Sequence, residues 1–484
     1  MFESEMLIGG EWVSGAGAVL DVQNPATQET IGTINNATTE EIDRATHAAR
    51  KAFPAWARLS PFKRSELLHR AGDLIDQRKD DIARAMTTEQ GKPLNEARGE
   101  VSKLAQTLHF YAEEGVRVHG EIIPNESNAY QSLVVREPVG VVAAISPWNY
   151  PAELIGWKIG GALAAGCTIV VKPPELTPFS PLAIARALHD AGIPAGVVNM
   201  VTGKGSSVGQ QLVESPLVDK IAFTGSGAVG LRIQQSSPTV KKLSLELGGN
   251  CPMIVTATAD LDAAVAGAAR RSFRNMGQIC IAINRIYVAE SVYEPFLSKL
   301  AAAADALTIA NGLDDPAADL GAMASAEPLE KTKAHLADAL EKGARLMAGG
   351  SRPEGEKFRK GFFFRPTVLA DCTHEMQVMT EETFGPLVGV APFRSLSEAV
   401  EKANDTPYGL ASYAYTKHVD EMRYLSSRLD YGNVAINNVD AGIINAPYGG
   451  RKQSGVGYEH GREGMLEYFN FKHVRVCFDE PEDA

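Results

Sequence analysis

Residues 139–171 read VGVVAAISPWNYPAELIGWKIGGALAAGCTIVV, and this stretch decides the fold class. Its apolar run at 139–145 is typical of a buried strand, and a second such run follows at 168–171. Between them, residues 153–165 have the length and pattern of a helix. A strand, a helix and a strand at this spacing predict a right-handed crossover and a parallel sheet.

The same alternation continues along the chain. Further strands are expected at 197–201, 220–223 and 242–247, and further helices at 181–191, 206–214 and 227–236. Before it, helices are expected within 40–117, among them 65–86 and 94–112. Parallel sheets bind ligands outside the carboxyl ends of their strands, so polar residues that end these runs are candidate site residues.

From residue 249 on, the sequence keeps an α/β pattern. Helices are expected at 260–275, 292–307, 328–342, 395–404 and 419–429, and strands at 286–289 and 434–436. The 484 residues suffice for about three domains or subdomains of ~150 residues each. We place the main boundary at Gly248-Gly249, directly after the fifth strand of the first sheet.

Composition and charge restrict the classes of partner that the protein can have. The net charge is −12 and no lysine- or arginine-rich run occurs, which argues against a nucleic-acid or anionic-membrane partner. No apolar stretch reaches the ~18 residues of a spanning helix, and the N-terminus lacks a signal-peptide pattern, so we expect a cytoplasmic protein. The five cysteines form no CxxC pair, which predicts reduced thiols and no metal site.

Cys280 is the candidate nucleophile. It ends the segment SFRNMGQIC (272–280), between a helical run that stops at Gly277 and a β-branched run at 285–288. A thiol is the best nucleophile among ordinary side chains, although most free cysteines are inert core residues. Polar residues elsewhere in the chain favour the interpretation of Cys280 as a nucleophile over that of an inert core residue.

Two strand ends carry further candidate catalytic groups. Asn149 lies between two prolines in PWNYP (147–151), where a fixed amide can donate to an oxyanion; the alternative is an Asx-turn residue. Glu246 alternates with leucines in LSLELGG (243–249), so it points away from the leucine face and can serve as a general base. An exposed edge glutamate is the alternative for Glu246.

Two other strand ends predict a dinucleotide site. Lys172 and Glu175 in VKPPE can hold the two hydroxyls of a ribose, or they are a solvated loop pair. The carboxylate of Glu175 repels a 2′-phosphate and therefore favours NAD over NADP. The segment GSGAVG (225–230) follows a strand and opens a helix, an arrangement that suits a pyrophosphate, although a lone match of this motif is a weak signal.

These segments together resemble the aldehyde dehydrogenase superfamily from about residue 6 to residue 476. The matching motifs are PWNYP, KPPE, FTGS, LELGGN, FRNMGQIC, EETFGP (381–386) and PYGGRKQSG (447–455). The resemblance implies an α/β fold with a Rossmann-type NAD-binding domain at 1–119 and 139–248 and an α/β catalytic domain at 249–460. It also implies a small β bridging or oligomerisation segment at 120–138 and 461–484, and a homodimer or homotetramer.

The resemblance assigns roles to single residues. Cys280 aligns with the nucleophile, Glu246 with the general base and Asn149 with the oxyanion donor. Lys158 and Glu459 align with residues that pass protons out. Cofactor contacts align with Ile145, Trp148, Lys172, Glu175, Gly205, Gly209, Ser226, Leu247, Glu382 and Phe384.

The implied reaction is covalent and needs no metal. Cys280 adds to an aldehyde, hydride passes to NAD (NADP less readily), and water hydrolyses the thioester to a carboxylic acid. Two departures from the family's usual pattern stand out. Gly227 replaces a threonine, which removes a hydroxyl from the pyrophosphate site. Ile281 and Ala282 replace a second cysteine, so a disulfide switch beside the nucleophile is not expected.

The substrate signals are mixed. Arg274 looks like the arginine that succinate-semialdehyde dehydrogenases use for the substrate carboxylate, or it is a cation at a helix C-terminus. That subgroup has a second arginine where this chain has Trp157, an aromatic wall similar to that of betaine and amino-aldehyde dehydrogenases. We expect a small aliphatic semialdehyde or other anionic aldehyde, with an amino-, betaine-type or aromatic aldehyde as the alternative.

Three rival functions remain. The segment GSGAVG suggests a Rossmann dehydrogenase without a covalent step. Such an enzyme would still transfer hydride after Cys280 is replaced by alanine. A non-enzymatic relative is expected to lack one of Cys280, Glu246 and Asn149, all of which are present. An acylating enzyme that transfers the thioester to coenzyme A conflicts with Glu246, because an activated water would waste the intermediate.

Overall fold

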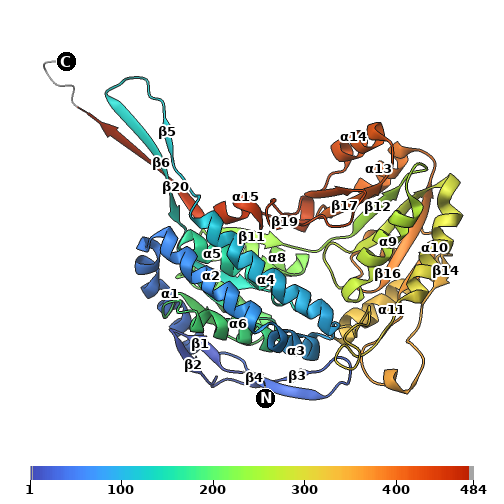
Figure 1. Ribbon diagram of the computed structural model, residues 1–484, viewed down its shortest axis with the longest axis horizontal. Helices are drawn as coiled ribbons and strands as arrows, with labels where there is room; N and C mark the ends of the chain where they lie inside the picture. Colours follow the sequence, from blue (N-terminus) through green and yellow to red (C-terminus); the bar gives the residue numbers. More distant parts are fainter. Residues whose placement is uncertain (1, 3, 479–484) are drawn as a thin grey trace.

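The structure, a computed structural model, describes residue 2 and residues 4–478. Its first sheet has the spatial order β19-β11-β10-β7-β8-β9-β1-β2 (Figure 1). The parallel sheet predicted from residues 139–247 is confirmed. Its parallel strands are β7 (Val141–Ile145), β8 (Thr168–Lys172), β9 (Val198–Met200), β10 (Lys220–Thr224) and β11 (Lys242–Glu246). The antiparallel strands are β1 (Met6–Ile8), which lies next to β9, and the two edge strands β2 (Glu11–Val13) and β19 (Gly455–Val456).

Both faces of this sheet are buried. Val142 and Ala144 of β7 pack into one apolar cluster, and Val141 and Ala143 pack into another on the opposite face. The first cluster contains α2 (Pro61–Gln77), α3 (Lys79–Gln90), α4 (Leu94–Gly115), α5 (Glu153–Ala165) and α6 (Phe179–Asp190). The second contains most of the buried face of α1 (Thr39–Arg58), together with α7 (Gln210–Glu214) and α8 (Gly227–Ser236).

Two helix predictions in this region are wrong in detail. The helix expected at 65–86 is two helices, because Arg78 (φ −96°, ψ 11°) ends α2 and caps the start of α3. The helix expected at 206–214 begins as a π turn over Gly205–Gly209 before α7. Apolar periodicity runs through both junctions, so the pattern alone does not reveal them.

The strand order reverses between β7 and β10. From β7 the chain runs outward through β8 and β9, and it then returns to the other side of β7 for β10 and β11. At such a reversal the connections leave in opposite directions and open a crevice at the carboxyl ends of the strands. Ile145 and Thr224 end the two strands that border this crevice.

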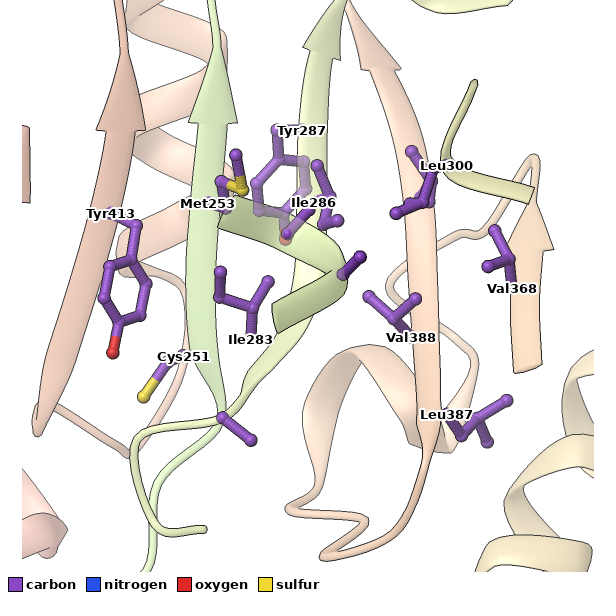
Figure 2. Packing of buried hydrophobic residues seen from close by; sticks show 14 of the residues in the cluster. Cys251, Met253, Ile283, Ile286, Tyr287, Leu300, Val368, Leu387, Val388 and Tyr413 are labelled. Carbon is purple, nitrogen blue, oxygen red and sulfur yellow. The ribbon is translucent and has the colours of Figure 1, made fainter. Parts of the chain in front are cut away.

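The second sheet has the order β14-β15-β16-β13-β12-β17-β18, and β14 alone is antiparallel to its neighbour. Figure 2 shows its apolar packing, with Cys251, Ile283 and Val388 on three successive strands. The strands are β12 (Cys251–Val255), β13 (Ile283–Ala289), β14 (Arg345–Ala348), β15 (Thr367–Ala370), β16 (Leu387–Phe393), β17 (Ala411–Tyr415) and β18 (Asn433–Ile436). The helices of this half are α9 (Leu261–Phe273), α10 (Tyr293–Ala306), α11 (Ala326–Glu341), α12 (Gln377–Thr380), α13 (Leu396–Asn404) and α14 (Val419–Arg428).

The helix expected at 260–275 ends earlier. Phe273 is its last residue, and Asn275 and Met276 take positive φ values of 50° and 58°. These left-handed residues turn the chain sharply out of α9 and toward Cys280. Non-glycine residues adopt this region rarely, so the turn depends on its surroundings.

A three-stranded antiparallel arm projects from the body of the molecule (Figure 1). It consists of β5 (Glu121–Ile123), β6 (Tyr130–Pro138) and β20 (Phe469–Cys477), with β6 in the middle. The helix α15 (Gly461–Leu466) precedes β20, and a separate hairpin is formed by β3 (Val19–Gln23) and β4 (Thr30–Asn35). Residues from 479 on, within the bridging segment predicted for 461–484, lie outside the described residues.

One short strand links the two halves of the molecule. β19 lies within the range 249–460 assigned to the catalytic domain, but it pairs with β11 of the first sheet. The loop at 437–457 therefore returns from the second sheet to the end of β11, where Glu246 lies opposite Gly455. Among the described helices, none is long and apolar enough to cross a bilayer.

Candidate active site

Three cavities lie in a row between the two sheets. The outermost, about 760 Å³, lies at the crevice between β7 and β10. The middle one, about 230 Å³, shares Trp148 and Ser226 with it. The innermost, about 80 Å³, meets the middle cavity at Asn149 and Cys280. A thiol and a carboxamide therefore lie where two differently lined spaces meet.

The outermost cavity has the features of an adenosine site. Lys172 ends β8 and its Nζ lies 2.8 Å from Oε2 of Glu175. Burial raises the pKa of Glu175, but the charge and hydrogen bond of Lys172 outweigh this effect and lower it. The two predicted residues therefore form an ion pair at the cavity wall. Ile145, Gly205, Gly209 and Ser226 also line this cavity.

The start of α8 suits a pyrophosphate. Ser226 caps the helix by accepting a hydrogen bond from the backbone N–H of Val229 at 3.4 Å. A Cβ on Gly225 would lie 2.4 Å from the ring of Phe223, so the tight turn requires glycine. A Cβ on Gly227 would meet nothing within 4 Å, so the position that lacks the family's threonine is open space. Together with the ion pair of Lys172, these features fit a dinucleotide.

The middle cavity is lined by the remaining predicted cofactor residues. Oε1 of Glu382 accepts a hydrogen bond from the N–H of Gly249 at 3.0 Å, and burial raises its pKa to about 7. Phe384 packs edge-on against Trp148 with 5.4 Å between ring centroids. A Cβ on Gly248 would lie 2.6 Å from Oε2 of Glu382, so this glycine leaves room for the carboxylate. Leu247 lines the same cavity.

Cys280 is half-buried between the cavities. Its Sγ lies 3.7 Å from the hydroxyl of Tyr448. Burial raises the pKa of the thiol to about 12, the contact with Tyr448 opposes that rise, and the charges of Glu246 and Glu382 add to it. The resting sulfur is therefore protonated. A base has to take its proton as it attacks.

Asn149 is held by a buried polar network. Its side-chain N–H donates to the carbonyl of Gln278 at 2.9 Å, and its Oδ1 is buried without a partner among the described residues. The carbonyl of Asn149 accepts from Nζ of Lys92 at 2.8 Å and from Nδ2 of Asn275 at 3.0 Å. This network fixes the carboxamide at the edge of the thiol cavity. An amide N–H₂ has a second donor, which the cavity leaves available.

Glu246 lies apart from the cavity linings. It is buried, its Oε2 has no partner among the described residues, and it lines neither cavity that Cys280 borders. Burial raises its pKa well above the usual range, the charge of Glu459 raises it further, and Lys158 opposes both. Nζ of Lys158 lies 2.6 Å from Oε1 of Glu459 and 2.7 Å from Oγ1 of Thr224. The structure thus gathers Glu246, Lys158 and Glu459 into one buried charge cluster.

The innermost cavity carries the predicted substrate residues. Arg274 lines it and caps α9, and its Nε lies 2.8 Å from Oε1 of Glu96. Both interpretations of Arg274, a helix-end cation and a cavity cation, therefore describe its position. Trp157 forms part of the wall, with its ring 4.1 Å from His460 and 5.4 Å from Tyr448.

Sequence reasoning missed several groups at this site. Tyr448 lies within the quoted motif PYGGRKQSG, but its contact with a thiol 168 positions away depends on the fold. Arg271 and Lys103 also line the innermost cavity. Site residues of the first sheet follow the carboxyl ends of their strands, as expected. Those of the second sheet, Cys280, Glu382 and Phe384, instead come directly before a strand. The site lies between the carboxyl edge of one sheet and the amino edge of the other.

Comparisons with known proteins identify the family of this chain. The family model for the aldehyde dehydrogenase family matches residues 12–474. A succinate-semialdehyde dehydrogenase [NADP(+)] of Escherichia coli (strain K12) is 44% identical, over 98% of both chains. A 3-sulfolactaldehyde dehydrogenase of Pseudomonas putida is 45% identical, over 98% of this chain and 97% of its own. A solved betaine aldehyde dehydrogenase from Staphylococcus aureus in complex with NAD⁺ is 34% identical with a TM-score of 0.96, covering 99% of this chain and 96% of its own.

The fold and the matched span define an α/β oxidoreductase that acts on aldehydes with NAD(P). The chain belongs to the aldehyde dehydrogenase family.

Proposed function

We propose that this enzyme oxidises a small aliphatic semialdehyde, or another small anionic aldehyde, to a carboxylic acid through a covalent bond to Cys280. One observation carries the proposal. Asn149 and Cys280 are shared by the cavity that suits the nicotinamide and by a small cavity whose lining includes cations. An aldehyde bound in the small cavity presents its carbonyl to both the thiol and the hydride acceptor.

The first step is addition of Cys280 to the carbonyl. As the sulfur attacks, its proton passes to a base; Glu246 is the proposed base, because its charge reaches the thiol and its raised pKa suits proton transfer. The carbonyl oxygen becomes an oxyanion, which the free N–H of Asn149 and the backbone N–H of Cys280 stabilise. Removing one such donor typically lowers the rate by ~10²–10³.

The nicotinamide, when bound, supplies the acceptor for the hydride that leaves the thiohemiacetal carbon. Glu382 and Phe384 are positioned to hold its ribose and ring. The acyl group then remains on Cys280 as a thioester. Glu246 takes a proton from water, which attacks the thioester, and the thiol and the carboxylic acid are released. The proton that Glu246 took from the thiol has to leave before Glu246 accepts one from water. The carboxylate of Glu459 is its proposed acceptor, and the ammonium of Lys158, which pairs with Glu459 in the same buried cluster, stabilises that carboxylate.

We propose a preference for NAD over NADP, although the E. coli relative carries NADP(+) in its name. A 2′-phosphate would lie beside the Glu175 carboxylate. The variant Glu175→Gln removes that repulsion and should lower the ratio of kcat/KM with NAD to kcat/KM with NADP by about tenfold. An unchanged ratio would remove the argument.

The substrate class is tested with a panel of aldehydes and both nicotinamides. Succinate semialdehyde should give a higher kcat/KM than 4-aminobutanal or benzaldehyde, because Arg271 and Arg274 line the cavity. The second candidate is an amino- or betaine-type aldehyde, which the aromatic wall of Trp157 and Tyr448 favours. Preference for 4-aminobutanal would reverse the order of the two proposals.

The remaining assignments are also proposals. We infer a homo-oligomer built through the arm, whose exposed Ile122 and Phe471 suit a protein partner. The proposed division is an NAD-binding domain at 1–119 and 139–248, a catalytic domain at 249–460 and a bridging segment at 120–138 and 461–484. A cytoplasmic location is supported by five cysteines that are all free.

A further inference from the structure

Arg271 is a buried cation with unused hydrogen-bonding capacity. It lies in the last turn of α9, only 8% of its side chain is exposed, and it lines the same cavity as Cys280. Its Nη2 donates to Oδ1 of Asp440 at 3.0 Å, but its Nε is buried with no hydrogen-bond partner among the described residues. Its Nη1 also has no hydrogen-bond partner among the described residues, so this nearly buried guanidinium has donors left for an anion in the cavity that it lines.

Asp440 does not explain the position of Arg271. The neighbouring Arg270, half of which is exposed, already binds both carboxylate oxygens of Asp440 at 2.7 and 3.1 Å. That forked contact is the strong geometry for an arginine and a carboxylate. Arg271 adds a single bond to one oxygen. Arg270, in contrast, is absent from the lining of the cavity.

Arg274 supplies a second cation to the same wall. Its Nε is taken by Glu96 at 2.8 Å, which leaves the terminal N–H₂ groups of the guanidinium for another acceptor. Tyr150 and Trp157 form aromatic parts of the lining of this cavity of about 80 Å³, which also includes the carboxylates of Glu153 and Asp440. Two guanidinium groups in a space of this size match a carboxylate or a sulfonate, whose oxygens accept several N–H bonds at once.

We propose that Arg271, together with Arg274, binds the anionic group at the far end of the aldehyde and so determines specificity for anionic substrates. The inference rests on the proposed function and assigns a residue to its substrate selectivity. The free Nη1–H₂ of Arg271 donates to the anion, while Asp440 stays paired with Arg270. The carbonyl end of the same molecule then lies at Cys280.

The test compares charged and neutral substrates of equal chain length in the full enzyme. The variants are Arg271→Gln, Arg271→Lys and the matched control Arg270→Gln, which removes the same charge from the same helix and the same partner, Asp440. Each is assayed with succinate semialdehyde and with butanal, which has the same chain without the charge. The readout is kcat/KM for each substrate, resolved into kcat and KM.

For Arg271→Gln we expect kcat/KM with succinate semialdehyde to fall about 10- to 100-fold, mainly through KM, while butanal changes less than about twofold. Arg270→Gln should change both substrates less than about twofold, because surface pairs contribute little. For Arg271→Lys we expect an intermediate loss with succinate semialdehyde only. Lysine keeps the positive charge but lacks the two parallel N–H donors of a guanidinium. If Arg271→Gln does not fold, the lysine variant decides alone.

Equal losses on both substrates would make Arg271 a structural residue and would overturn the inference. The inference would also fall if Arg271→Gln kept the full preference of the wild type for succinate semialdehyde, and the proposed function would then stand. Wild-type enzyme that turned over butanal better than succinate semialdehyde would instead refute the proposed substrate class, and the role of Arg271 with it.

Discussion

At the scale of single residues, the chemistry depends on a sulfur that is kept protonated. Burial and the charges of Glu246 and Glu382 raise the pKa of Cys280 to about 12, and the Tyr448 hydroxyl offsets only part of this. A buried neutral thiol reacts slowly with adventitious electrophiles. The site therefore reserves its reactivity for a carbonyl that arrives beside a base and an oxyanion donor.

This environment predicts the pH dependence of alkylation. Without cofactor, iodoacetamide should modify Cys280 with an inflection well above the ordinary thiol pKa of ~8.5. Because Glu382 has a pKa of about 7, it is charged above that pH and raises the pKa of the thiol. The variant Glu382→Gln should therefore speed alkylation at about pH 8 to 9. Peptide mapping measures the rate, and the exposed Cys477 is followed in the same digest.

An inflection of the wild type at or below ~8.5, or an unchanged rate in Glu382→Gln, would contradict this electrostatic account.

Single residues of the site differ in how far the sequence reveals them. Cys280, Asn149, Lys172 and Glu382 lie in local motifs, and each does line the row of cavities. The contact of Tyr448 with the thiol could not be predicted, because it joins parts of the chain that only the fold brings together. Glu246 also lies in a local motif, and the structure places it in a buried cluster with Lys158 and Glu459, outside the lining of the two cavities that Cys280 borders.

At the scale of elements, the link between β11 and β12 sets the position of the nucleophile. A Cβ on Gly249 would lie 2.3 Å from the backbone oxygen of Cys280, a distance at which the backbone has to move. Because the atom in the way belongs to the backbone of Cys280, this movement displaces the residue that carries the thiol. Gly249 is therefore required by close approach rather than by its own backbone angles.

The variant Gly249→Ala should lower kcat by more than about tenfold, because misplacement by about 1 Å costs up to ~10²-fold. The aldehyde assay measures this loss, and thermal unfolding checks that the protein remains folded. The control is Gly99→Ala on α4, where a Cβ meets nothing within 4 Å. The control should keep full activity and gain up to ~1 kcal/mol in free energy of unfolding. Full activity of Gly249→Ala would contradict the close approach.

Elements were predictable where local periodicity decides them. The strands of the first sheet and helices such as α5 and α13 match the predicted runs to within a few residues. The break at Arg78 was not predictable, because neither glycine nor proline marks it. Gly277 marks the end of the helical run before Cys280, but nothing local indicates that Asn275 and Met276 are left-handed. Such positions are imposed by packing and by buried hydrogen bonds, which a local pattern does not contain.

At the scale of the whole molecule, the projecting arm carries apolar side chains that are exposed in the single chain. Ile122 and Phe471 are 72% and 67% exposed, and β6 is the middle strand between β5 and β20. Apolar side chains on such a projecting three-stranded arm are stable when another copy of the chain covers them. The bridging role of this segment was expected from the family resemblance, whereas its exposed apolar residues come from the structure.

The variant Phe471→Glu should shift the enzyme to smaller species, because a charge buried in an interface lacks a partner. Light scattering after size exclusion measures the mass. The control is Val419→Glu on α14, an equally exposed apolar position at 74% that lies outside the arm. Wild-type enzyme that runs as a monomer, or an unchanged mass of Phe471→Glu, would contradict an interface through the arm.

The central claim is an acyl group carried on Cys280 between oxidation and hydrolysis. Intact-mass analysis of acid-quenched wild type and Glu246→Gln, each followed over time after mixing with NAD and succinate semialdehyde, tests it most directly. Loss of the base slows both attack by Cys280 and hydrolysis of the thioester, so in Glu246→Gln the acyl group forms later and then persists. The account predicts a mass increase equal to one acyl group, mapped to Cys280 and absent from Cys280→Ala, which is also inactive. An unmodified Cys280 in both the wild type and Glu246→Gln, or aldehyde oxidation by Cys280→Ala, would contradict the account.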